Sequence, residues 1–105
     1  CTACRRYGAL WAYGYEGEEI RTTGQTAAYS RNRKKLGFHF CATCASVAFW
    51  RATVLNDKGQ RRIAVNLRLA ETPEQVAPLL IKHFDGLDKF EALPRDGRCV
   101  RDMWF

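Results

Sequence analysis

Residues 36–44 read Leu-Gly-Phe-His-Phe-Cys-Ala-Thr-Cys, an alternating apolar stretch that runs directly into a C-x-x-C pair. Apolar side chains at every second position are typical of a β-strand with one face turned to the core. Cys41 and Cys44 are therefore expected on a turn at the end of a strand, as in zinc knuckles. His39 falls between two phenylalanines, on the opposite face of this strand, and we expect it to face solvent.

Short segments on both sides of this stretch also have the pattern of strands. Residues 9–15 place Trp11, Tyr13 and Tyr15 on one face, and residues 61–69 alternate branched apolar side chains with other residues. The remaining expected elements are a short helical turn within 1–8, strands at 18–23 and 27–30, a returning strand at 46–55 and a hairpin turn at 56–59. The fold class is therefore mainly β.

One short helix is expected late in the chain. Thr72 is a suitable N-cap, Pro73 suits the first helical position, and Gln75 would complete a capping box. Apolar residues at helical spacing continue the pattern to residue 85, although Pro78 favours a later start. His83 lies on the same apolar side of this predicted helix, and we expect it either to pack against neighbouring residues or to cap the helix.

Size and composition indicate a single globular domain over residues 1–105. Hydrophobic residues make up 47% of the chain and charged residues 27%, which excludes a disordered protein. No apolar run approaches the ~20 residues of a membrane-spanning helix, and the opening residues 1–6 lack the apolar h-region of a signal peptide. We therefore expect a cytoplasmic protein without a membrane partner. The net charge of +6 favours anionic small molecules and is weak support for nucleic acid, so the basic run 31–35 is expected to be a solvated loop.

Four of the five cysteines form two C-x-x-C pairs, Cys1/Cys4 and Cys41/Cys44. In an intracellular chain this spacing predicts zinc ligands rather than disulfides, since two thiolates on one turn can reach one tetrahedral metal. A redox motif would need a βαβ setting that the pattern lacks. One four-cysteine site is possible if the strands bring the pairs together, or each pair completes a separate site with ligands from elsewhere. Cys99 has no partner at ligand spacing and is expected to be a small buried residue.

Several sequence blocks resemble the glutathione-dependent formaldehyde-activating enzyme family. They are C-T-A-C-R-R-Y-G-A-L-W-A-Y, F-H-F-C-A-T-C-A-S, V-N-L-R, F-D-G and G-R-C-V-R-D-M-W, and they span nearly the whole chain. The resemblance implies the β-tent fold, a zinc-binding fold of antiparallel sheets. It also implies the activity of an S-(hydroxymethyl)glutathione synthase, a carbon–sulfur lyase that joins glutathione to formaldehyde or a related aldehyde.

The resemblance further implies two zinc ions, one structural and one catalytic. Cys41 and Cys44 match two ligands of the closed structural site, whose partners would precede residue 1. Cys1 and Cys4 match the second and third cysteines of a C-x-C-x-x-C motif that holds the catalytic zinc with one position open. We therefore expect the native N-terminal segment to be missing from this sequence. Ala45 stands where the family usually has glycine, and a left-handed conformation there would cost about 1 kcal/mol.

The two carboxylates of glutathione suggest that Arg5 and Arg6 anchor the substrate, and that Tyr7 and Trp11 wall its pocket. The main alternative is a non-catalytic, zinc-ribbon-like module that uses the basic loop 31–35 to bind nucleic acid or protein. Binding of that kind should weaken steeply with salt, whereas a small thiol site should be far less sensitive.

Overall fold

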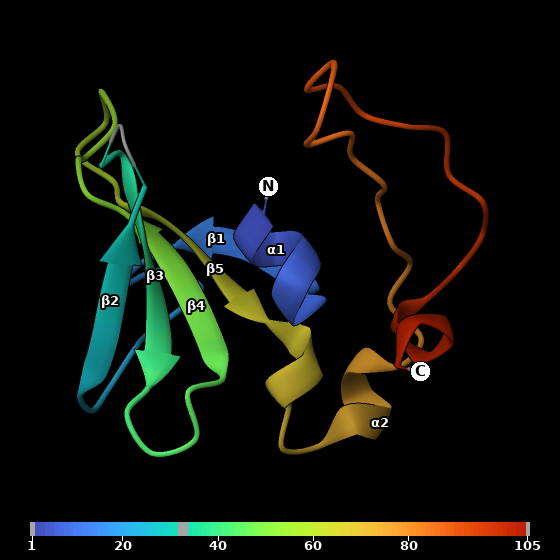
Figure 1. Cartoon of the computed structure of the whole chain (residues 1–105), viewed down its shortest axis with the longest axis horizontal. Helices are drawn as coiled ribbons and strands as arrows, with labels where there is room; N and C mark the ends of the chain where they lie inside the picture. The colour runs from blue at the N-terminus through green and yellow to red at the C-terminus, as the bar shows by residue number, and fades with distance from the viewer. Residues whose placement is uncertain (1, 32–33, 105) are drawn as a thin grey trace.

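The computed structural model of the chain, which describes residues 2–31 and 34–104, contains one five-stranded antiparallel sheet and several short helices (Figure 1). Along the chain the elements are α1 (Thr2–Tyr7), β1 (Trp11–Tyr15), β2 (Thr26–Ser30), β3 (Leu36–Cys41), β4 (Val47–Ala52), β5 (Arg62–Asn66), η1 (Leu67–Leu69), α2 (Pro73–Val76) and η2 (Val100–Met103). The prediction of a mainly β chain is confirmed. The described strands form a single sheet, where several sheets were expected.

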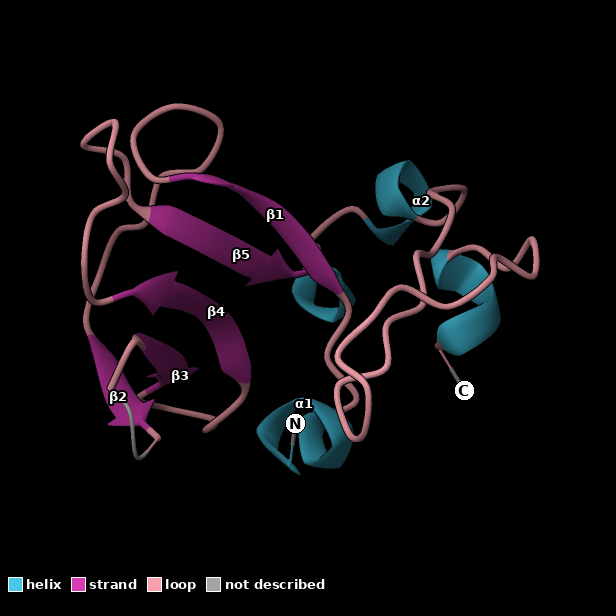
Figure 2. Ribbon diagram, turned by 90° about the horizontal axis from the view of Figure 1, so that it is seen from above, coloured by secondary structure: helices cyan, strands magenta, loops and turns pink. Residues whose placement is uncertain are grey.

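The sheet has the strand order β1-β5-β4-β3-β2 and curves from one edge to the other (Figure 2). Directly paired residues of neighbouring strands lie on the same face of a sheet. The pairing therefore gathers the aromatic side chains of several strands on one face. On this face the ring centroids of Trp11 and Phe38 are 6.3 Å apart, and Tyr7 of α1 lies 5.5 Å from Phe40. We call it the α1 face, since α1 packs on it through Tyr7.

The opposite face of the sheet is centred on β4 and β5. Ile63 is fully buried there, and Phe49 pairs across the strands with His39 and Val65. The loop after β1 covers the edge of this face, since a side chain at Gly14 would meet Ile20. Both faces therefore contribute to the core.

His39 is buried on this opposite face, with only 8% of its surface exposed. Its ring stacks on Phe49 with centroids 4.4 Å apart, and its Nδ1 hydrogen-bonds with the hydroxyl of Thr26 at 2.8 Å. Burial lowers the pKa of His39, and the positive charge of Arg51 lowers it further. The expectation of a solvent-facing His39 was wrong, because the Phe49 ring of the neighbouring strand β4 lies against the His39 ring.

No strand forms at 18–23 within the described chain, contrary to the prediction. The chain after β1 instead turns back on itself, with Gly17 at a φ of 86° and a single bridge between Glu16 and Ile20. The carboxylate of Glu19 accepts the amide N–H of Tyr15 at 2.7 Å. Hydrogen bonds from side chains to the backbone compete with the backbone hydrogen bonds between strands, which explains why residues 18–23 form a loop.

The strand predicted over 61–69 ends at Asn66, three residues early. The buried side chain of Asn66 accepts the amide N–H groups of Leu10 and Arg68, each at 3.2 Å, and donates to the carbonyl oxygen of Val47 at 3.0 Å. This amide turns the chain out of the sheet and begins η1. The returning strand is likewise shorter than predicted and ends at Ala52.

The predicted helix from Thr72 to residue 85 is wrong beyond its first turn. Helix α2 covers Pro73–Val76 only, and the Thr72 side chain makes no capping hydrogen bond. The carbonyl oxygen of Ala77 instead accepts the amide of Arg101 at 3.1 Å, which ties this segment to the C-terminal one. Pro78, without an N–H, suits the interruption.

Residues 79–99 form a long irregular hairpin on the side of the molecule farthest from β2 (Figure 1). His83 pairs with Asp96 at 2.9 Å across this hairpin rather than packing on a helix. Cys99 is half-buried, and its thiol donates to Asp102 at 3.3 Å, so the expectation of a buried Cys99 was also wrong. Over the residues that the structure describes, no helix has the length and apolar character needed to span a bilayer.

Candidate functional site

Cys41 is the last residue of β3, and Cys44 lies in the loop that leads to β4, so the pair stands at a strand end as predicted. The amide N–H of Ala45 donates to the carbonyl oxygen of Cys41 at 2.9 Å, and the amide N–H of Cys41 donates to the carbonyl oxygen of Ser46 at 2.9 Å. The backbone N–H groups of Cys44 and Thr43 also donate to the Cys41 sulfur and lower the pKa of its thiol. The thiolate is the form of cysteine that binds metals, so a lowered thiol pKa is compatible with a ligand role for Cys41.

Ala45 has a φ of 58°, the left-handed conformation in which glycine is preferred. The turn needs this conformation because the chain must reverse sharply between Cys44 and β4. Ala45 therefore carries the backbone strain that was expected if the knuckle closed in this way.

Cys4 lies in α1, on a different element from the knuckle cysteines. The indole N–H of Trp11 donates to the Cys4 sulfur at 3.4 Å, and the Trp11 ring packs on Phe38. Burial raises the pKa of Tyr13, and the charge of a Cys4 thiolate raises it further, while Arg62 lowers it. The structure thus brings Cys4, Trp11 and Tyr13 to one region of the α1 face. Cys1 lies outside the described residues.

The other predicted substrate-binding residues lie on α1 itself. Arg5 and Arg6 are exposed in its last turn, where cations suit the helix dipole. Tyr7 is 48% exposed and rests on Phe40. Arg5, Arg6 and Tyr7 therefore share the short helix α1 with Cys4.

The described cysteines are free thiols, and they fit part of a zinc site. Two thiols on one turn supply half of a tetrahedral thiolate set, and the amide donors to Cys41 suit a ligand that carries negative charge. Across residues 2–31 and 34–104, no three His, Cys, Asp or Glu side chains gather into a group that could hold a metal ion. Within that range, Cys41 and Cys44 therefore stand as one pair and Cys4 stands apart.

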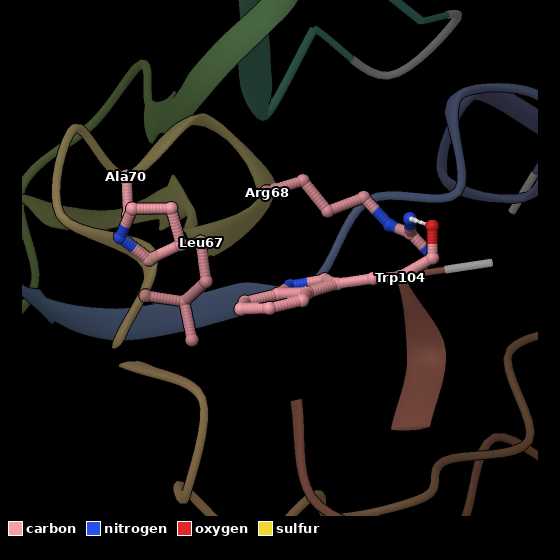
Figure 3. A pocket seen from close by; sticks show the side chains of 5 residues that line it. Leu67, Arg68, Ala70 and Trp104 are labelled. Carbon is pink, nitrogen blue, oxygen red and sulfur yellow. Dashed lines mark hydrogen bonds between the residues drawn. The ribbon is translucent and has the colours of Figure 1, made fainter. Parts of the chain in front are cut away.

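Arg68 is a residue whose role sequence reasoning missed. Figure 3 shows it beside a pocket of about 260 Å³, lined also by Leu67, Ala70, Pro73 and Trp104. Its guanidinium group donates to the backbone carbonyl oxygens of Gly8, Met103 and Trp104. Arg68 stands in the block V-N-L-R, but no spacing rule links it to segments so distant in the sequence. Its contacts make it a structural residue.

Comparisons with known proteins do not identify a family or a function for this chain. The chain matches no protein-family model, and neither the curated proteins nor the solved structures compared with it show a significant similarity.

Proposed function

We propose that this chain belongs to a zinc-dependent carbon–sulfur lyase of the β-tent type, which condenses glutathione with formaldehyde or a related aldehyde to S-hydroxymethylglutathione. Five sequence blocks that resemble the glutathione-dependent formaldehyde-activating enzymes support the reaction. A cytoplasmic location is part of the proposal, because free thiol ligands persist in a reducing compartment.

The observation that carries the proposal is the knuckle at the end of β3. A metal-binding thiolate is stabilised by amide N–H groups aimed at its sulfur, and the Cys41 sulfur accepts two of them, from Cys44 and Thr43. Cys41 and Cys44 would hold the structural zinc, and Cys1 and Cys4 the catalytic one.

At the catalytic position a bound zinc with one open coordination site would lower the pKa of a thiol and act as a Lewis acid. The residues of the chain would orient the reactants around it. The Trp11 indole fixes the Cys4 sulfur through its hydrogen bond at 3.4 Å. Exposed Arg5 and Arg6 would bind glutathione carboxylates, and Tyr7 and Trp11 would border the pocket. In the reaction a C–S bond forms, the carbonyl π bond breaks, and the former carbonyl oxygen takes the proton that the thiol loses.

Cobalt substitution tests the metal half of the proposal. Co²⁺ added to the 105-residue chain should give thiolate-to-metal charge-transfer bands, and Cys41→Ser should reduce their intensity. Cys99→Ser is the matched control, because Cys99 lies in the turn before η2 and belongs to neither pair. Equal losses in both variants, or no charge-transfer band in the wild-type chain, would remove the basis for a zinc site.

The reaction is tested by exchange NMR with ¹³C-formaldehyde and glutathione, against the uncatalysed rate. The zinc-loaded chain should accelerate formation of the hydroxymethyl adduct, and Cys4→Ser should abolish the acceleration while Cys99→Ser preserves it. If zinc binds firmly without acceleration, and cobalt spectra do not respond to glutathione, the non-catalytic binding module becomes the better description.

A further inference from the structure

The face of the sheet opposite α1 carries a pocket of about 280 Å³ that the cysteine chemistry does not use. Its floor is a row of paired residues that crosses three strands, from Ser30 through Gly37 to Arg51. Arg61, directly before β5, completes its rim. The pocket therefore combines two arginines with small residues on a rigid sheet.

The two arginines share one carboxylate. Arg51 lies 2.9 Å from one oxygen of Glu16, and Arg61 lies 3.4 Å from the other. Arg61 also donates to the carbonyl oxygen of Ala52 at 3.0 Å. Each guanidinium has five N–H donors, so these contacts leave donors for a ligand. Among residues 2–31 and 34–104, Glu16 is the one ion-pair partner of the two arginines, which leaves one positive charge uncompensated within that range. The two side chains are 39% and 35% exposed, so the groups are held in place yet open to solvent.

Gly37 keeps the floor of the pocket open. A Cβ atom built on Gly37 would stand 3.5 Å from the Ser30 hydroxyl and 3.5 Å from His39 Nε2. His39 uses its other nitrogen, Nδ1, for the bond with Thr26. A hydroxyl and a ring nitrogen thus flank a space that only a residue without a side chain leaves free.

We propose that this pocket binds a small monocarboxylate, whose oxygens are held by the guanidinium groups of Arg51 and Arg61. Guanidinium donors match the planar pair of carboxylate oxygens, and the single uncompensated positive charge matches a monoanion. The methyl or short alkyl end would lie over Gly37. This site is separate from Cys4, Cys41 and Cys44, and it does not depend on the proposed lyase activity.

Acetate, titrated into the ¹⁵N-labelled chain and followed by NMR, is the direct test. Sodium chloride at the same ionic strength serves as reference. The amide signals of Ser30, Gly37 and Arg51 should shift saturably with acetate, with half-saturation on the order of 10 mM for so small a ligand. Chloride should give no saturation at these positions.

Two variants probe the site in different ways. Arg51→Lys keeps the charge but loses the planar fork, and Gly37→Ala fills the floor at ordinary contact distances without strain. Each should weaken acetate binding at least about fivefold. Arg62→Lys is the matched control, because Arg62 neighbours Arg61 in sequence but lies over the Tyr13 and Trp50 rings on the α1 face, and it should leave acetate binding unchanged.

Three results would overturn the assignment. They are shifts that grow linearly with either salt, unchanged half-saturation in a correctly folded Gly37→Ala chain, and tighter binding of inorganic phosphate than of acetate at equal ionic strength. The last would identify an oxyanion site of another kind.

Discussion

Arg68 and Gly8, which are 60 positions apart in the sequence, are joined by a hydrogen bond from Arg68 Nε to the Gly8 carbonyl oxygen. The same guanidinium group donates to the carbonyl oxygens of Met103 and Trp104 at the end of η2. Gly8 ends α1 with a φ of 57°, a conformation that presents its carbonyl to Arg68. One side chain therefore fastens the first helix and the last one to the end of the sheet.

Arg68→Met should destabilise the chain by about 2 kcal/mol, since three carbonyl groups lose a charged donor while the alkyl packing is largely kept. The free energy of unfolding in urea measures the effect. Arg95→Met, in the exposed part of the C-terminal hairpin, is the control and should change stability by less than about 0.5 kcal/mol. Equal midpoints for the two variants would mean that Arg68 does not fasten the termini.

Ala45→Gly should raise stability by about 1 kcal/mol, because the left-handed φ of 58° is costly for alanine and free for glycine. The thermal midpoint of unfolding reports this gain. Ala42→Gly, in the same exposed loop but without a positive φ, should give no gain and a slight loss from added chain entropy. A stabilising Ala42→Gly would point to general loop flexibility and not to strain at Ala45.

The strands and the knuckle were predictable from sequence because their signals are local. Alternating apolar residues around Phe38 and aromatic residues around Tyr13 mark β3 and β1 within a few positions. The cysteine pair at the end of β3 was predicted at a strand end for the same reason. Only periodicity and spacing are needed for such assignments.

The errors arose where distant contacts override local pattern. The apolar residues after Pro73 have helical spacing, yet Ala77 bonds to Arg101, a partner no local rule can supply. His39 lies on the strand face predicted to be polar, but β4 places Phe49 against it. The rows of paired residues that bring Arg51 beside Gly37 likewise depend on strand order, which the sequence pattern does not specify.

The carboxylate of Asp85 should titrate below its ordinary pKa of 3.8, because it accepts the amide N–H groups of Asp88, Lys89 and Leu87 at 2.9, 3.1 and 2.9 Å. A lowered folded pKa means that the unfolded turn binds protons first as the pH falls. The stabilisation of this turn is therefore complete above pH of about 4 and is lost as the pH falls through the folded value.

The carboxyl ¹³C shift of Asp85 measures this pKa directly, and amide exchange of residues 87–89 measures the stability of the turn. Asp85→Asn should remove the dependence on pH below about 4. A carboxyl pKa at or above 3.8 would show that the three amide bonds do not persist in solution.

Glu16→Gln tests the arginine pair from its other side. Glu16 accepts from Thr22 at 3.3 Å and contacts Arg51 and Arg61, so its neutralisation should destabilise the fold by about 1 kcal/mol in a urea titration. The same change removes the carboxylate that both guanidinium groups contact in the described part of the chain, and acetate should then bind more tightly. Glu91→Gln, which removes an exposed ion pair 3.9 Å long with Lys89, should alter neither quantity. If Glu16→Gln instead weakens acetate binding, the main effect of the Glu16 carboxylate on the ligand is to position the two arginines. Its repulsion of the acetate charge is then the smaller effect.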